Sequence, residues 1–127
     1  MQYALLFYQT PEEFAARQDP AKREAFWGAF GPYMKALYDA GVVVAGAGLE
    51  PPESTTVVKV RDGNRRVQDG PYADTKEQLG GFFIIEVPNL DAALDWAARY
   101  PAGGGGVEVR PCLPRQAAEE MRKQAGQ

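Results

Sequence analysis

The stretch "DGPYADTKEQLGGFFIIEV", residues 69–87, decides the fold of this chain, because it joins a turn-rich connector to the most apolar run in the sequence. Its last part, Gly81 to Val87, is nearly all apolar, as is typical of a central strand covered on at least one face. Its first part, Asp69-Gly70-Pro71, predicts a sharp turn, since glycine accepts unusual backbone angles and proline fixes its own φ. Between them, Asp74 and Glu77 have the spacing of a capping box and predict one helical turn.

The segments at the start of the chain predict a strand followed by two helices. The run "YALLFY", residues 3–8, is short and apolar and predicts a buried strand. Thr10 and Asp19, each followed by proline, predict the N-caps of two successive helices, the second ending at Gly41. Pro32 lies inside this second helix and predicts a kink or two abutting helices. The helix has a wide apolar face formed by Phe26, Trp27, Phe30, Met34, Leu37 and Tyr38.

The remaining segments predict a second strand, a hairpin, a helix, a last strand and a helical tail. "VVVAGAGLEPP", residues 42–52, reads as a strand, and residues 54–70 form two strands around an Asp-Gly or Gly-Asn turn at 62–64. Asn89 caps a helix that Pro101 ends. Four glycines at 103–106 predict a linker before the strand at 107–111, and residues 113–127 predict a polar amphipathic helix.

This order of elements predicts an α+β fold. Without the hairpin it is βαββαβ, the ferredoxin-like plan in which both helices pack on one face of an antiparallel sheet. Strands this apolar need a cover on the other face too, and a second copy of the chain is the natural one. We therefore expect a homodimer through the sheet faces, a domain of residues 1–111 and a separate tail of residues 112–127.

Composition excludes several classes of function. The 127 residues carry a net charge of −3 with scattered basic residues, so we expect no nucleic-acid partner. No apolar run approaches the roughly 20 residues of a membrane span, and the N-terminus lacks the features of a signal peptide, so a cytoplasmic protein is expected. The absence of histidine removes Ser-His-Asp triads, Cys-His pairs and the usual zinc sites. Neither "GAGLEP" nor the glycine run fits a phosphate loop, so we expect neither a cofactor nor a metal.

The candidate site residues come from a helix end, the first strand and the opening connector. Asp39 lies in the last turn of the long helix, where the helix dipole disfavours a negative charge, which suggests either a catalytic role or a merely exposed aspartate. The connector is interpreted as either a structural link or a ligand-binding loop. The candidate ligand-binding residues are Tyr8, Asp69, Gly70, Pro71, Tyr72, Thr75, Lys76 and Glu77.

The sequence resembles the DGPF branch of the YCII-related family. The resemblance is carried by Asp69-Gly70-Pro71-Tyr72 with the following "ADTKEQLGGF", by "LDAALDWAARYP" and by "VEVRP", and it covers residues 1 to about 111. It implies a ferredoxin-like fold that forms a dimeric α/β barrel. Some relatives are enzymes on small aromatic compounds, such as a dehydrochlorinase. Others carry a His–Asp pair, proposed as a catalytic dyad in a cleft between helix and sheet.

Two functions follow from the resemblance. Asp39 matches the aspartate of the dyad, but the position of its histidine, near Phe30, holds none. The first function is therefore a small-molecule-binding protein or enzyme with Asp39 as general base, whose pKa burial would have to raise, and Lys76 as an anion contact. The second is a non-catalytic sensing or regulatory dimer, since members of this branch are often encoded beside sigma factors.

Overall fold

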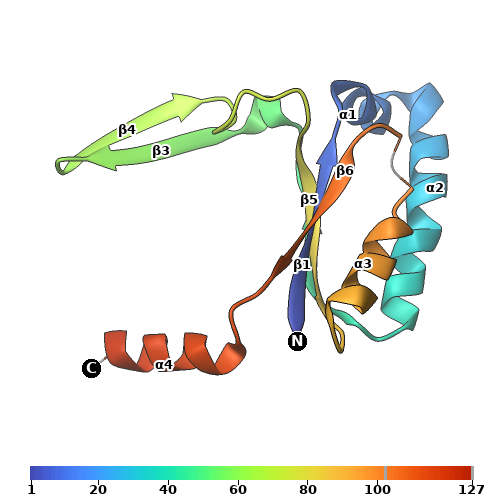
Figure 1. Ribbon diagram of the computed structural model, residues 1–127. Coiled ribbons are helices and arrows are strands. Elements are labelled where there is room, and N and C mark those ends of the chain that lie inside the picture. Colours follow the sequence, from blue (N-terminus) through green and yellow to red (C-terminus); the bar gives the residue numbers. More distant parts are fainter. Residues whose placement is uncertain (102, 127) are drawn as a thin grey trace.

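Two antiparallel strands, β1 (Gln2–Gln9) and β5 (Gln78–Glu86), form the centre of the sheet. The computed structural model describes residues 1–101 and 103–126 (Figure 1). Side chains of β1 alternate between buried and half-buried along the whole strand, so one face lies in the core and the other is only partly covered. The remaining strands of the sheet are β2 (Val43–Gly48) and β6 (Gly106–Pro111) at its two edges.

The strand order β2-β5-β1-β6, with every pair antiparallel, is the ferredoxin-like order. The βαββαβ plan with an inserted hairpin is therefore confirmed within one chain. The apolar run of residues 81–87 lies in the central strand β5 as predicted, apart from Val87, which follows it.

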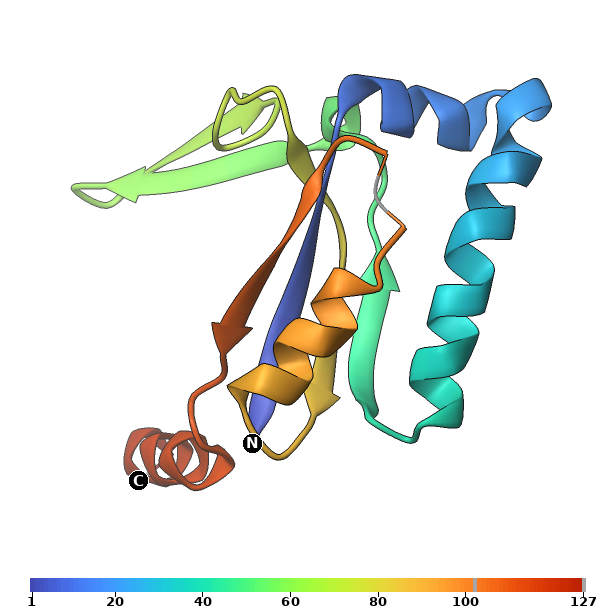
Figure 2. The same cartoon turned by 45° about the vertical axis from the view of Figure 1, so that its right-hand side comes forward.

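The three helices before β6 cover one face of this sheet (Figures 1 and 2). They are α1 (Pro11–Gln18), α2 (Pro20–Asp39) and α3 (Leu90–Ala98). Thr10, Asp19 and Asn89 cap them as predicted, and Thr10 forms a complete capping box with Glu13. Helix α2 is continuous, with Pro32 inside it, so the alternative of two abutting helices at that proline is wrong.

The hydrophobic core lies between these helices and the sheet. It contains strand residues that point toward the helices, residues of the inner faces of α2 and α3, and Tyr100 after α3. Its members are Tyr3, Leu5, Phe7, Tyr33, Leu37, Phe83, Ile85, Val87, Ala93 and Tyr100.

The connector of residues 70–77 contains no helical turn, so the capping box predicted for Asp74 and Glu77 is wrong. Hydrogen bonds from side chains hold the loop in another conformation. The Gln78 amide donates to the backbone oxygens of Ala73 and Thr75, and the Thr75 hydroxyl donates to the backbone oxygen of Glu77. The predicted turn before this loop is present, because Gly70 has a φ of 102°.

Glu13 ties the glycine-rich linker to α1. Its carboxylate accepts hydrogen bonds from the backbone N–H groups of Gly103 and Gly105, at 3.4 and 3.1 Å, besides closing the capping box. The predicted linker is thus held in place at Gly103 and Gly105, and one carboxylate fixes both the start of α1 and the entry to β6.

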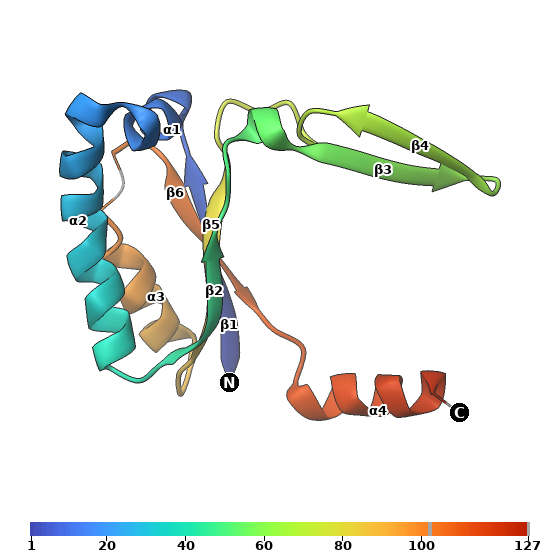
Figure 3. The same cartoon turned by 180° about the vertical axis from the view of Figure 1, so that it is seen from behind.

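Two arms extend from the chain on the side away from α2 and α3 (Figures 1 and 3). One is the hairpin of β3 (Thr56–Arg61) and β4 (Asn64–Asp69), which follows the short 3₁₀ turn Pro52–Ser54 and forms a sheet of its own. Its predicted tight turn is confirmed by positive φ at Asp62 and Gly63. The other arm is α4 (Arg115–Ala125). Among residues 1–101 and 103–126, no helix is both long and apolar enough to span a membrane.

Leu37→Ala tests the position of the core. Leu37 of α2 is fully buried, so we expect the substitution to leave a cavity and to lower the free energy of unfolding by about 2–5 kcal/mol. Leu94→Ala on α3 is the matched control, because Leu94 is 45% exposed and its loss should cost about 1 kcal/mol or less. Urea unfolding at one protein concentration measures both, and equal losses would contradict this core.

Candidate functional site

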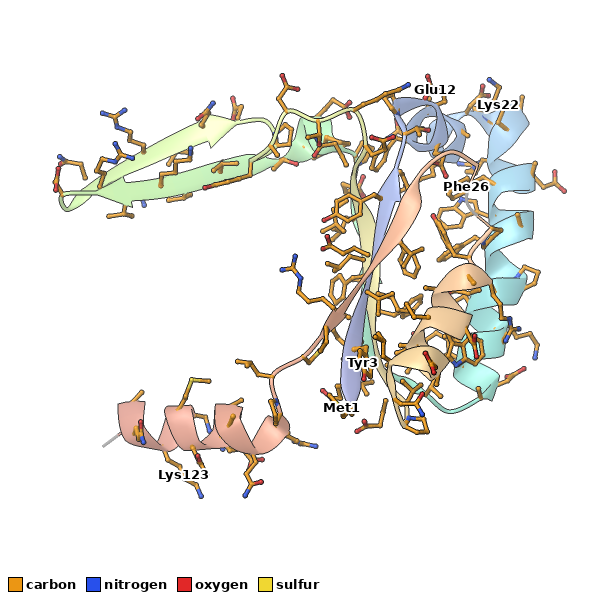
Figure 4. All side chains as sticks on the ribbon, viewed as in Figure 1. Met1, Tyr3, Glu12, Lys22, Phe26 and Lys123 are labelled. Atoms are coloured by element: carbon orange, nitrogen blue, oxygen red, sulfur yellow. The ribbon has the colours of Figure 1, made fainter. Side chains whose placement is uncertain are left out.

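A cleft of about 280 Å³ lies between α2 and the sheet, and we call it the α2 cleft. One wall is the aromatic face of α2, and the other is formed by the strands β1, β2 and β5. Figure 4 shows Phe26 of α2 projecting toward the sheet. The lining residues are Phe7, Gln9, Arg17, Phe26, Trp27, Phe30, Met34, Tyr38, residues 46–48 and residues 80–83.

Glycines on β2 and β5 make the sheet wall of the cleft flat. Gly46 and Gly80 have no room for a side chain: a Cβ on Gly46 would collide with the Phe83 ring, and one on Gly80 would lie 2.5 Å from the Gln9 side chain. At Gly80 the pairing with β1 also shifts register, which leaves this residue as a bulge between the paired positions 79 and 81. The Phe83 ring and the Gln9 side chain therefore lie close over the backbone at these two glycines.

The polar end of the cleft is a chain of three hydrogen bonds. Arg17 donates one hydrogen bond to the Gln9 side-chain oxygen, at 3.0 Å, and another to the backbone oxygen of Leu49. Gln9, which is 5% exposed, in turn donates to the Tyr100 hydroxyl at 3.3 Å. These bonds fix the guanidinium at one end of an otherwise apolar and aromatic space.

Burial changes the acidity of three groups around the cleft. Removal from water lowers the pKa of the Arg17 guanidinium, and the nearby negative charge of Glu50 partly opposes this change. Burial raises the pKa of the Tyr33 hydroxyl, which donates to the backbone oxygen of Trp96. It also raises the pKa of the Tyr100 hydroxyl, with the hydrogen bond from Gln9 acting in the opposite direction.

Five of the predicted ligand-binding residues meet in a different place, a hollow of about 510 Å³ beside the connector. Tyr8 reaches this hollow because it points away from the buried face of β1. The hollow is a surface recess, since Tyr72 is 79% exposed and lies with its ring 5.0 Å from the Lys59 ammonium. The five residues are Tyr8, Pro71, Tyr72, Thr75 and Glu77.

The other predicted residues of the connector lie outside this hollow. Asp69 is the last residue of β4, and Gly70 follows it with its N–H bonded to the backbone oxygen of Thr55. Lys76 borders two recesses against α1.

Asp39 lies apart from both the α2 cleft and the hollow. It is the last residue of α2, its carboxylate is 63% exposed, and it forms an ion pair with Lys35 one turn earlier. The chain by itself therefore does not supply the burial that a general base at Asp39 requires, and that role stays a prediction. Within the described part of the chain, no three acidic or cysteine side chains are close enough to hold a metal ion.

The sequence predicts the α2 wall of the cleft only as part of a wide apolar helix face. Helical periodicity identified the apolar face of α2, but it could not distinguish rings that meet the sheet from rings beside a space. One feature of the sequence indicates a space at this position. The apolar face of α2 holds more large aromatic residues than the glycine-rich strand at residues 43–48 can pack against.

Comparisons with known proteins show the family of the chain. The model of the YCII-related domain matches residues 1–116. The chain belongs to the YCII-related family. An uncharacterized protein of Rhizobium meliloti (strain 1021) is 32% identical over 114 residues, which cover 87% of this chain and 91% of that protein.

A solved structure is similar to this family member at low identity. It is 5-chloro-2-hydroxyhydroquinone dehydrochlorinase from Burkholderia phenoliruptrix AC1100, in complex with 2,5-dihydroxybenzoquinone. The match has a TM-score of 0.47 and 17% identity, and it covers 91% of this chain and 98% of that one.

The buried tyrosines predict a loss of stability at alkaline pH. Because the folded chain keeps protons on Tyr33 and Tyr100 that the unfolded chain releases, we expect the free energy of unfolding to fall as the pH rises above about 10. Below this range both states hold these protons, so the contribution does not change with pH. Denaturant unfolding at a series of pH values measures the slope. The variant with Tyr33→Phe and Tyr100→Phe should show a shallower fall, and an unchanged slope would refute the assignment.

Proposed function

We propose that the chain binds a small, planar and largely apolar molecule in the α2 cleft. The observation that carries the proposal is the lining: aromatic rings and a thioether on the helix side, and glycine backbone on the sheet side. Aromatic faces and edges suit a flat ring, and the flexible Met34 adapts to its outline.

The size of the cleft limits the ligand. At about 280 Å³ the cleft lies just below the range of small-molecule sites, roughly 300–1,000 Å³. We therefore propose a molecule of one or two rings. Trp27, which is 43% exposed, forms part of the wall and stacks edge-on against Phe26, with ring centroids 5.1 Å apart.

An enzymatic role on such a molecule would use the polar end of the cleft. Arg17 would stabilise negative charge that develops on the substrate, in a site sheltered from water. Tyr38 is the other ionisable side chain of the lining. General-base catalysis by Asp39 would require another molecule to cover its carboxylate, because the single chain leaves that side chain exposed.

Phe26→Ala tests binding in the α2 cleft. With Trp96 replaced by phenylalanine, Trp27 is the remaining tryptophan, and we expect its fluorescence to change saturably as benzamide is added. Loss of the Phe26 ring should weaken binding roughly three- to tenfold, the worth of one aromatic contact. Leu94→Ala, on the exposed side of α3, is the control and should leave the affinity unchanged. Absence of saturable binding in the parent protein would refute the proposal.

We also propose that two copies associate through the uncovered faces of their sheets. The centre of this face is apolar and half-buried, with Leu6 of β1 beside Phe82 and Ile84 of β5. The two arms extend beyond it on the same side (Figure 3). They carry exposed apolar residues, which are Val58, Val60 and Val67 on the hairpin and Leu113 and Met121 at α4.

The exposed area supports this association. The chain exposes 8856 Å². A compact monomer of this mass is expected to expose about 6,700 Å², so the excess is about 2,200 Å². A standard interface buries about 800 Å² of each partner. The arms and the open face therefore offer more area than a stable dimer needs.

Leu6→Lys tests the dimer. A charge at the centre of the open face would lose its water on association, so we expect the dissociation constant to rise about tenfold or more. Leu94→Lys, on the helix side of the molecule, should leave it unchanged. Sedimentation equilibrium measures both variants, and a monomeric parent protein at micromolar concentrations would show that the open face has another role.

A further inference from the structure

We infer that the ligand of the α2 cleft is an aromatic acid whose carboxylate pairs with Arg17. This inference rests on the proposed function and adds the charge of the ligand. It starts from the contrast between the apolar walls of the cleft and Arg17, the one cation among the described residues of its lining.

The Arg17 guanidinium has more hydrogen-bond donors than its contacts with the described residues use. It has five N–H groups, and hydrogen bonds to Gln9 and to the backbone of Leu49 use two of them. Among the residues that the structure describes, no carboxylate lies within 4.0 Å of it. A partly buried cation without an anionic partner is costly, and a bound carboxylate removes that cost.

The position of Arg17 is fixed before a ligand arrives. Gln9 and Leu49 hold the guanidinium from two sides, and the guanidinium carbon lies 5.3 Å from the centre of the Phe14 ring. A planar, oriented guanidinium recognises a carboxylate more selectively than a flexible ammonium does. The ring of the same ligand would lie against the aromatic wall, so one molecule satisfies both parts of the cleft.

Glu50 is the acid that competes for this cation. Burial lowers the pKa of Arg17 and the negative charge of Glu50 partly offsets this, although the Glu50 carboxylate forms no ion pair with the guanidinium at 4.0 Å or less. It is exposed at the end of β2, outside the lining of the cleft. Removing this charge therefore offers a test that leaves the hydrogen bonds of Arg17 in place.

The experiment compares benzoate with benzamide, two planar molecules of similar shape that differ in charge at neutral pH. Both are titrated against Trp27 fluorescence in the full chain carrying Trp96→Phe. At low salt we expect benzoate to bind about tenfold more tightly or better, as a hydrogen bond to a charged group provides. Salt should weaken benzoate binding and leave benzamide binding unchanged.

Variants assign the preference to Arg17. Arg17→Met should weaken benzoate binding about tenfold or more and benzamide binding much less, so that the two affinities become similar, and Arg17→Lys should retain part of the preference. Glu50→Gln should tighten benzoate binding alone. Urea unfolding of each variant at the same concentration shows whether the fold is intact.

The outcomes separate the two proposals. Equal affinities for benzoate and benzamide, or a preference that survives Arg17→Met, would overturn the aromatic acid and leave the proposed cleft function standing. If neither compound binds, both proposals fail.

Discussion

The contacts of the Phe7 ring fix the arrangement of the whole helix layer on the sheet. Phe7 is 2% exposed on β1 and packs against Phe30 and Tyr33 of α2, Phe83 of β5 and Tyr100 after α3, with ring centroids 4.6 to 6.3 Å apart. One side chain thus joins both halves of the βαββαβ repeat. Because the contacts are mostly edge-to-face, they set the angle of each element as well as its distance.

The α2 cleft begins where this cluster ends. Phe7 and Phe83 belong both to the core and to the wall of the cleft, and Phe30 of that wall packs against the core. Beyond them the Phe83 ring lies over Gly46 and the Gln9 side chain lies over Gly80, so these side chains form the sheet wall at the two glycines. The side of the cleft that adjoins the core is therefore preformed, while Met34 on α2 adapts to the outline of the ligand.

The fold could be predicted from the sequence because the local signals for caps and turns agree with the order of strands and helices in the whole chain. The caps at Thr10, Asp19 and Asn89 and the Asp62-Gly63 turn each depend on neighbouring residues. The failures depend on side-chain hydrogen bonds, one local and one between distant segments. The side chain of Gln78 determines the connector in place of a capping box, and Glu13 reaches residues 103–105 across the fold. The hydrogen-bonded chain of Arg17, Gln9 and Tyr100 could not be predicted from residue spacing, because its members lie in α1, in β1 and after α3.

The arm formed by β3 and β4 has a consequence for the dynamics of the chain. Almost all of its side chains are exposed and it has no core, and a two-stranded hairpin of this kind is marginally stable by itself in water. Its amide hydrogens should exchange with solvent by local opening, while those of β1 and β5 exchange only when the whole domain unfolds. The segment of residues 70–77 thus connects the least stable part of the molecule to its most protected part. The rate of amide exchange in the hairpin would show whether another molecule is bound to the hairpin.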